Sequence, residues 1–365
     1  MRYIKPHFYD KFECIADKCK DTCCAGWQIV IDEDTLEKYA KVGGKFGNRL
    51  MNSIDWGEEM FYQNDRRCSF LGDDNLCDIY REMGPDYLCD TCRNYPRHVE
   101  EYDGLRELSL TLSCPTVAKM ILECKDPVTF VETETMEEDD FEEFDFLLFS
   151  QLEDARDVVF HILQNREVDL RVRMKMCEHL AYEFQKCVDD GTTYQIDRLL
   201  EKYEHFDSNT VKISEKCYEK RKKEYALLVQ LEKLRPEWTE LLEKVERTLY
   251  GKGEEEYNKI VRNFQHQYGY ESENRLQWER IGEQLMMFFV YTYFCGAVYD
   301  DWIISKMRLA VFCTTWIQEL VMFAFVENDG EIGMENVIEM AYRFAREVEH
   351  SDLNLDTIEE WLQYE

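Results

Sequence analysis

Cysteines dominate the chemistry that this sequence could perform. Ten of the fifteen lie within the first 124 of 365 residues. The tightest spacing, Cys89-Asp-Thr-Cys92, lets both sulfurs reach one ion from a single turn, as in zinc knuckles and iron–sulfur loops. The N-terminus lacks the apolar core and cleavage site of a secretory signal, so we expect a cytoplasmic chain with reduced thiols. Such a density of thiols then indicates metal or redox chemistry before structural disulfides.

The predicted metal ligands are nine N-terminal cysteines. They are Cys14, Cys19, Cys23, Cys24, Cys68, Cys77, Cys89, Cys92 and Cys114. All-thiolate sites suit zinc and iron–sulfur clusters alike, but only His7 and His98 lie in this region, which disfavours a mixed Cys/His zinc site. We therefore favour a four-iron cluster over zinc. The spacing leaves open which four cysteines hold it, and a second site is compatible with the number of thiols. The later cysteines lie mostly on apolar helix faces and are expected to pack in the core.

The elements that must position these thiols are short. Residues 1–127 are predicted to form a small cysteine-rich α+β region, with strands near residues 27–31 and 76–80. Asp103-Gly104 separates two alternating segments, which is a strong hairpin signal. A helix is expected to begin at Pro115, since proline favours the first helical position. The acidic residues 128–140 are expected to form a linker.

The remainder, residues 141–365, shows helical periodicity almost throughout and is predicted to be an all-α bundle. The fold class is therefore mainly α. The most buried pair of helices is expected near residues 277–299 and 302–326. The first of these is too short and too closely followed by charges to be a membrane span, so we expect no membrane association. The net charge of −32 disfavours nucleic-acid partners and is compatible with a basic, lysine-bearing protein partner.

Several common catalytic signatures are absent from the sequence. No Gly-x-Gly-x-x-Gly follows a strand, and there is no P-loop and no His-Glu-x-x-His. Cys19-x3-Cys23 begins the triplet of radical S-adenosylmethionine enzymes, but Gly26 stands where the third cysteine is needed. A nucleotide-binding or radical enzyme of these classes is thus not indicated.

Longer strings resemble the flagellin lysine-N-methylase family. They are Asp21-Thr-Cys-Cys-Ala-Gly-Trp27, Leu76-Cys-Asp-Ile-Tyr80, Leu88-Cys-Asp-Thr-Cys-Arg-Asn-Tyr-Pro-Arg97 and Leu112-Ser-Cys-Pro115. The resemblance covers the first ~125 residues most strongly. Some of these pieces also resemble a broader group of cysteine-rich proteins described as zinc or iron chelators.

The resemblance implies methyl transfer from S-adenosylmethionine to lysines of flagellin, or of another lysine-bearing protein, with an iron–sulfur cluster in the enzyme. Tyr95, Tyr291 and Tyr293 are then candidates for lining the active site or acting as a base, although tyrosines at such positions often only pack. Arg97 is a candidate for the donor carboxylate, with a surface ion pair as the alternative.

Two further hypotheses stay open at this level. The chain could be a non-enzymatic module that binds or delivers zinc or iron, or an iron–sulfur sensor with its helical half as a platform for partners. Binding of S-adenosylmethionine would separate the enzyme from both.

Overall fold

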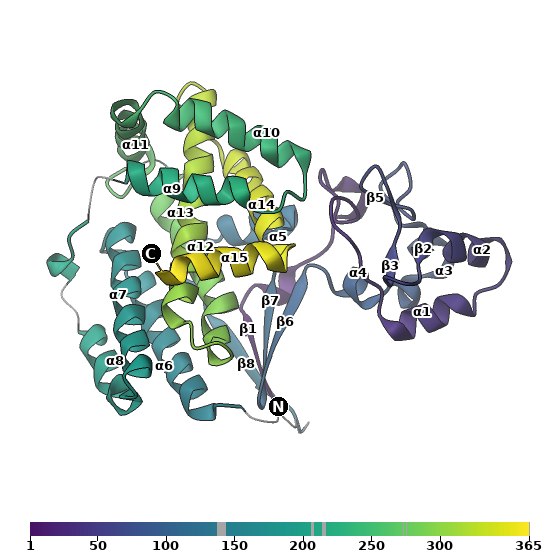
Figure 1. Cartoon of the computed structure of the whole chain (residues 1–365), viewed down its shortest axis with the longest axis horizontal. Coiled ribbons are helices and arrows are strands. Elements are labelled where there is room, and N and C mark those ends of the chain that lie inside the picture. The colour runs from purple at the N-terminus through teal and green to yellow at the C-terminus, as the bar shows by residue number, and fades with distance from the viewer. Residues whose placement is uncertain (137–143, 206–207, 214–216, 273, 275, 365) are drawn as a thin grey trace.

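The computed structural model describes residues 1–136, 144–205, 208–213, 217–272, 274 and 276–364. Figure 1 shows a large helical body from which a smaller lobe projects on one side. Both chain ends lie in the body. Helices dominate the described residues, so the predicted class, mainly α with a small α+β N-terminal region, is confirmed.

The lobe, residues 14–94, has a hydrophobic core of its own. This core includes Ile31, Tyr39 and Phe70, each with no exposed surface. Asp32 caps the first helix, because its side chain accepts a hydrogen bond from the backbone nitrogen of Thr35 at 2.9 Å. The elements of the lobe are α1 (Glu33–Ala40), α2 (Gly44–Ser53), β2 (Ile54–Asp55), β3 (Met60–Phe61), β4 (Gln63–Asn64), β5 (Arg67–Cys68), α3 (Asp78–Met83) and α4 (Asp90–Asn94).

Neither strand predicted within the lobe forms as expected. Residues 27–31 contribute one isolated bridge, between Val30 and Met60. In residues 76–80, Cys77 bridges to Leu71 and then precedes α3 directly. Both segments are apolar, but each is fixed by the irregular loops around the cysteines, where strand propensity is overridden by tertiary contacts.

The body contains one four-stranded sheet in the order β6-β7-β1-β8. The predicted hairpin is confirmed: β6 (Arg97–Tyr102) and β7 (Leu105–Leu110) pair antiparallel around Gly104, whose φ is +70°. β1 (Arg2–Pro6) lies parallel to β7 on one edge and antiparallel to β8 (Phe130–Glu134) on the other. The N-terminal strand is therefore an interior strand of the sheet.

Two expectations about domain boundaries are corrected by this sheet. Residues 130–134, expected to lie in a linker, form β8 because β1 offers them a free edge. The hairpin and α5 (Pro115–Leu122) pack in the core of the body, so the division between the two cores falls near residue 94 and not at 127. Residues 137–143, the rest of the acidic run, lie outside the described ranges.

Around the sheet pack the helices of the C-terminal region. They are α6 (Phe146–Leu163), α7 (Leu170–Asp189), α8 (Ile196–Glu204), α9 (Tyr218–Gln230), α10 (Pro236–Val245), α11 (Glu254–Tyr268), α12 (Trp278–Tyr293), α13 (Ile303–Glu327), α14 (Met334–Glu349) and α15 (Asp352–Tyr364). As expected, α12 and α13 are the most buried pair. The segments Trp278–Val298 and Ile303–Glu327 are long and apolar enough to span a membrane, but 89% and 78% of their apolar windows are buried inside the protein. Burial in the core accounts for their composition.

Candidate functional site

The nine predicted ligand cysteines are all free thiols and fall into two neighbouring groups. The junction thiols, where the lobe meets the body, are Cys14, Cys19, Cys23 and Cys114, and they interact electrostatically with one another. The lobe thiols are Cys24, Cys68, Cys77, Cys89 and Cys92. These five likewise interact electrostatically with one another. The fold thus brings together cysteines from residues 14 to 114.

Two pairs of thiols are hydrogen-bonded to each other. The bond from Cys23 lowers the pKa of the Cys24 thiol to about 7, while the pKa of Cys23 is raised. In the same way, Cys92 lowers the pKa of Cys89 and has its own pKa raised. One thiol in each pair is therefore predisposed to be a thiolate, the form that binds metals.

The sulfur atoms of the nine cysteines are the ligands that an all-thiolate metal site needs. In this structure, however, they are not arranged around a common point. Among the described residues, no group of three or more Cys, His, Asp or Glu side chains is placed to hold one ion. The two histidines of the region are engaged elsewhere: His7 contacts Thr129 beside the sheet, and His98 Nε2 lies 2.5 Å from a Glu100 oxygen. In this structure both histidines thus have hydrogen-bond partners other than the cysteines.

Ion pairs of Asp21 join the segment that carries three of the junction thiols to the body. Asp21, between Cys19 and Cys23, pairs with Arg346 of α14 and lies 3.1 Å from Nη1 of Arg235. Burial opposes ionisation of Asp21, but the two guanidinium groups hold its pKa below the usual range. Arg346 also donates to the backbone oxygens of Ser113 and Asp21, at 2.8 and 2.9 Å. The cysteine motifs are therefore fixed to α14.

A buried polar network extends from the same place. The Ser113 hydroxyl lies 3.1 Å from the Tyr95 hydroxyl and 2.9 Å from His350 Nε2. Thr111, which also contacts Ser113, donates to a Glu349 oxygen at 2.6 Å. The network thus connects the Leu-Ser-Cys-Pro motif with the C-terminal end of α14.

Burial perturbs the titratable groups of this network in opposite directions. It raises the pKa of Glu349 to about 7, despite hydrogen bonds from Thr111 and Ser113. Burial, together with the charges of Arg346 and Arg235, lowers the pKa of His350 to about 3. At neutral pH the imidazole is neutral, while the carboxyl group lies near its midpoint, where a group can both accept and donate protons.

The three tyrosines and the arginine that the sequence suggests for the active site lie in different parts of the structure. Burial raises the pKa of Tyr95, Tyr291 and Tyr293, so all three phenols stay protonated. Tyr95 belongs to the network, and the Tyr293 hydroxyl reaches Glu349 at 3.4 Å. Tyr291 instead donates to the backbone oxygen of Ile4 at 2.8 Å within the core. Arg97 lies over the ring of Phe12, at 5.3 Å, and lines neither of the two cavities described below.

Sequence reasoning missed Glu349, His350 and Arg346. No local pattern marks them, because α14 reads as an ordinary amphipathic helix. Of the network, Tyr95 and Ser113 are the residues that lie within the cysteine motifs.

A cavity of about 310 Å³, here called the junction cavity, lies between lobe and body. Its lining combines acidic, basic and apolar side chains. They are Asp21, Ala25, Gly26, Asp65, Arg66, Arg235, Glu237, Trp238, Leu241, Arg343, Arg346 and Glu347.

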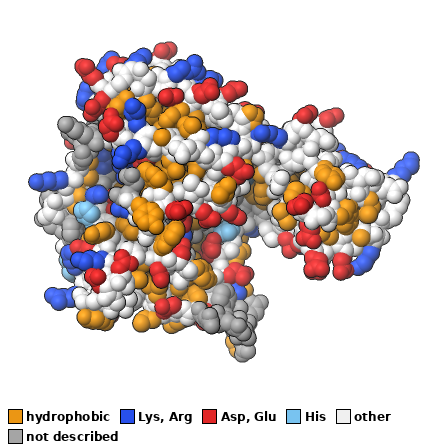
Figure 2. All heavy atoms as spheres, viewed as in Figure 1, with side chains coloured by type: hydrophobic (Ala, Val, Ile, Leu, Met, Phe, Trp, Pro, Cys, Tyr) orange, Lys and Arg blue, Asp and Glu red, His pale blue; other side chains and the backbone are white. Residues whose placement is uncertain are grey.

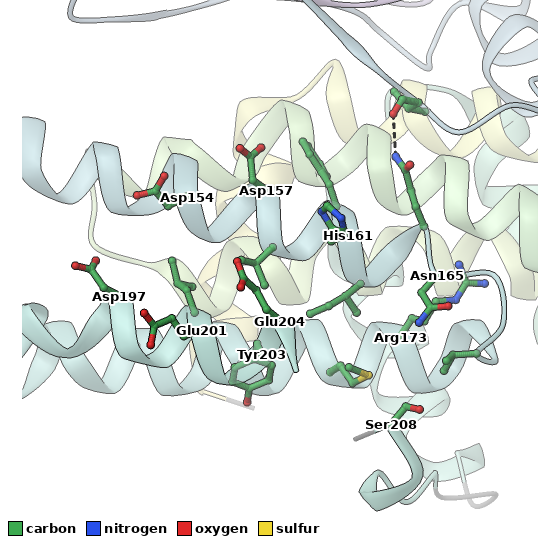
Figure 3. A pocket seen from close by; sticks show the side chains of 18 of the residues that line it. Asp154, Asp157, His161, Asn165, Arg173, Asp197, Glu201, Tyr203, Glu204 and Ser208 are labelled. Atoms are coloured by element: carbon green, nitrogen blue, oxygen red, sulfur yellow. Dashed lines mark hydrogen bonds between the residues drawn. The ribbon is translucent and has the colours of Figure 1, made fainter. Parts of the chain in front are cut away.

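A second and larger cavity, of about 1310 Å³, opens between α6 and α8 and is here called the acidic cavity. Figure 3 shows its carboxylates in two rows, with Asp154 and Asp157 along α6, and Asp197, Glu201 and Glu204 along α8. Within the described part of the chain, none of these five forms an ion pair with a lysine or arginine. Apolar side chains such as Val158 and Leu200 complete the walls.

The C-terminal part of the chain matches a known family. Residues 156–365 match the model of the FliB lysine N-methylase C-terminal domain. A lysine-N-methylase of Salmonella typhimurium is 30% identical over 137 residues, which are 35% of this chain and 34% of that protein. The flagellar biosynthetic protein FliU of Salmonella muenchen is 31% identical over 137 residues, 35% of this chain and 81% of its own length.

The matched segment thus spans about a third of the length of the lysine-N-methylase. No solved structure matches the chain. The family model alone covers more than half of the 365 residues, including α14 with Arg346, Glu347 and Glu349. The chain belongs to the FliB lysine N-methylase family.

Proposed function

We propose that this protein is a cytoplasmic protein-lysine N-methyltransferase that uses S-adenosylmethionine and acts on flagellin or a similar lysine-bearing protein. The observation that carries the proposal is the family match over residues 156–365. The names of the relatives, lysine-N-methylase and flagellar biosynthetic protein, agree with it.

The proposed reaction needs a deprotonated lysine. The lysine nitrogen forms the new N–C bond while the C–S bond of the sulfonium breaks, leaving a thioether and a methylated amine. The ammonium proton must first pass to a base, and Glu349 is the network group whose pKa lies nearest neutrality. Tyr95, Ser113 and Thr111 provide a chain of hydrogen-bonded hydroxyl groups that ends at it.

The acidic cavity supports the substrate half of the proposal. Its five carboxylates, which have no lysine or arginine partner in the described ranges, attract cationic side chains of a protein substrate, and the apolar walls suit the methylene groups of these side chains. The cavity thus serves to dock the substrate and is separate from the site of methyl transfer. The net charge of −32 extends this attraction over the molecule. On the face shown in Figure 2, acidic side chains occur on both body and lobe.

We further propose that the lobe thiols hold an iron–sulfur cluster. Four of them, Cys24, Cys68, Cys89 and Cys92, interact electrostatically and include both thiols with lowered pKa values. Bound there, a cluster would cross-link the short elements of the lobe and add a redox-sensitive centre.

The test combines composition, binding and activity on one sample. Protein purified without oxygen should contain iron and sulfide, bind S-adenosylmethionine in calorimetry, and add methyl groups to flagellin lysines, detected by mass spectrometry as increments of about 14 Da per methyl group. A colourless protein with stoichiometric zinc would contradict the cluster. Failure to bind the donor would contradict the methyltransferase.

A second candidate function is an iron–sulfur or zinc module without catalysis, which senses redox state or delivers metal. The observation that favours it is the Cys23–Cys24 pair, since a thiol with a pKa of about 7 is reactive near neutral pH. Metal without donor binding in the experiment above would select this function.

A further inference from the structure

The junction cavity contains a buried carboxylate oxygen that has no hydrogen-bond partner among the described residues. Glu347 is 3% exposed, and its Oε2 accepts a hydrogen bond from the backbone nitrogen of Leu234 at 2.9 Å. Its Oε1 is buried and, within the described ranges, accepts no hydrogen bond. Because an unsatisfied buried acceptor is destabilising, a ligand that donates to Oε1 would be held there.

Guanidinium groups face the same space. Arg235 and Arg346 are committed to Asp21 and to backbone oxygens. Arg66 differs, because in the described part of the chain only its Nη1 is engaged, with the backbone oxygen of Leu234 at 2.6 Å. Its other N–H groups lie at the cavity and can bind a carboxylate in the forked geometry typical of arginine.

The hairpin that carries Arg66 is held in a costly conformation. Asp65 and Arg66, between β4 and β5, both have positive φ angles, +48° and +62°. Such a turn favours Asn-Gly, and a side chain like that of arginine destabilises it. Strained backbone of this kind is concentrated where a side chain must be presented to a ligand.

The lining also defines the chemical class of the ligand. An anion such as phosphate would meet the carboxylates of Glu347, Asp21, Asp65 and Glu237, while a simple cation would meet the guanidinium groups. A zwitterion with separate ammonium and carboxylate groups satisfies both. The volume of about 310 Å³ is at the lower end for small-molecule sites, which suits an amino acid.

An apolar wall completes the cavity. Trp238 and Leu241, on consecutive turns of α10, are 4% and 7% exposed. The indole face attracts cations, including a sulfonium, at contact distances of up to about 6 Å.

We propose that the junction cavity binds the methionyl end of S-adenosylmethionine, with Glu347 accepting from its ammonium group, Arg66 binding its carboxylate and Trp238 facing its sulfonium. This assignment rests on the proposed function and adds the location of the donor. It also places the transferred methyl group beside the junction thiols and α14, at the meeting point of lobe and body.

Calorimetry on the full-length protein tests the assignment with S-adenosylmethionine, S-adenosylhomocysteine and adenosine as ligands. In Glu347→Gln, the amide oxygen can keep the bond to Leu234, but an NH2 group then faces the ligand's ammonium. We expect this variant to bind S-adenosylmethionine and S-adenosylhomocysteine at least tenfold more weakly than the wild type. Its affinity for adenosine, which lacks the methionyl end, should be unchanged. Arg66→Gln should weaken the binding of the same two ligands to a similar extent.

Arg66 is exposed and not needed for the core, so this variant should fold normally. Glu335→Gln, on the exposed face of the same helix as Glu347, is the matched control.

The outcomes are distinguishable. Donor binding that weakens in both cavity variants, with melting temperatures unchanged and the control intact, supports the assignment. Donor binding that persists at full strength in both variants overturns the assignment and leaves the methyltransferase proposal standing. A wild-type protein that binds no donor at millimolar concentration overturns both.

Discussion

At the scale of single residues, Glu349 combines burial with an intact set of hydrogen bonds. Its carboxyl group accepts from Thr111 and from the backbone of Ser113, while His98 acts on it through its charge. Burial nevertheless prevails and raises the pKa to about 7. A carboxyl group of this kind links the stability of the protein to pH.

The sign of that link follows from proton uptake. Between the ordinary glutamate pKa near ~4.5 and the folded value of about 7, the folded state binds more protons at Glu349 than the unfolded state, so stability falls as pH rises through this window. We expect Glu349→Gln, which cannot ionise, to gain stability relative to wild type across the window, by up to about 3 kcal/mol.

Thermal unfolding of both proteins at several pH values measures this difference. His350, whose pKa is lowered to about 3, titrates in the opposite sense but is common to both proteins and cancels. A difference in melting temperature that is constant between pH 4.5 and 7.5 would contradict the raised pKa.

The thiols give a second prediction at this scale. Cys92→Ala should lose the bound metal and melt at a lower temperature, because metal binding and folding of the lobe are coupled. Cys177→Ala removes a fully buried thiol from α7, far in sequence from the proposed ligands, and should keep the metal content of the wild type. Metal analysis of the two variants, expressed side by side, checks the prediction; equal metal content in both would remove Cys92 from the ligand set.

The cysteines are the part of the candidate site that the sequence indicates, and their role as metal ligands stays a prediction. Spacing and resemblance assign nine positions to one region, and the fold brings all nine into two adjoining groups. The residues that connect this region to the body are not predictable, because Arg346, Glu347 and Glu349 lie more than 200 residues later on an ordinary helix. Such partners depend on tertiary contacts that leave no local signal.

At the scale of elements, the contact between the lobe and the loop before α10 depends on one glycine. Gly26 has a φ of +91°, and a Cβ atom there would lie 2.4 Å from Nε of Arg235. Arg235 in turn donates to the backbone oxygen of Ala25 at 2.7 Å. The position thus tolerates no side chain while this contact is kept.

We expect Gly26→Ala to destabilise the protein by about 1–3 kcal/mol, through backbone strain and displacement of Arg235. Gly191→Ala is the control, since Gly191 has a φ of +64° but no heavy atom of the other described residues lies within 4 Å of the place that a Cβ would take. The difference between their free energies of unfolding isolates the contact with Arg235. Equal values would show that strain alone accounts for the effect.

Helices and strands were predicted correctly where the periodic pattern of apolar residues was long, and incorrectly where it was short. The pair α12 and α13 and the hairpin β6–β7 are expected from their patterns, which the core and the sheet then satisfy. Residues 76–80 read as a strand, but the loop around Cys77 leads into α3 instead. Residues 130–134 were predicted to be part of a linker, since two of them are acidic and an acidic run follows. They form a strand because they pair with the edge of β1, and this tertiary contact cannot be inferred from the sequence.

At the scale of the whole molecule, we expect the net charge and the acidic cavity to govern the encounter with the basic protein substrate of the proposed function. Asp197→Asn combined with Glu201→Gln should raise KM for a lysine-rich protein substrate several-fold and leave kcat nearly unchanged, because the change acts on attraction and not on the methyl transfer. Higher salt should reduce the difference from wild type.

Steady-state kinetics at two ionic strengths measure this effect. Glu254→Gln with Glu255→Gln, which removes two charges from the first turn of α11, is the control for net charge alone. If both double variants raise KM equally, the cavity has no special part in binding the substrate.

The interior position of β1 also constrains the order in which the chain can assemble during synthesis. Its two edges pair with residues 105–107 and 130–134, so the sheet cannot close until more than 130 residues have left the ribosome. Every thiol of both groups has emerged by then, the last being Cys114, which follows the second strand of the hairpin. The lobe, whose last thiol is Cys92, can therefore fold around the cluster proposed for it while the body is still incomplete, and the five residues of β1 are among the last to find their place.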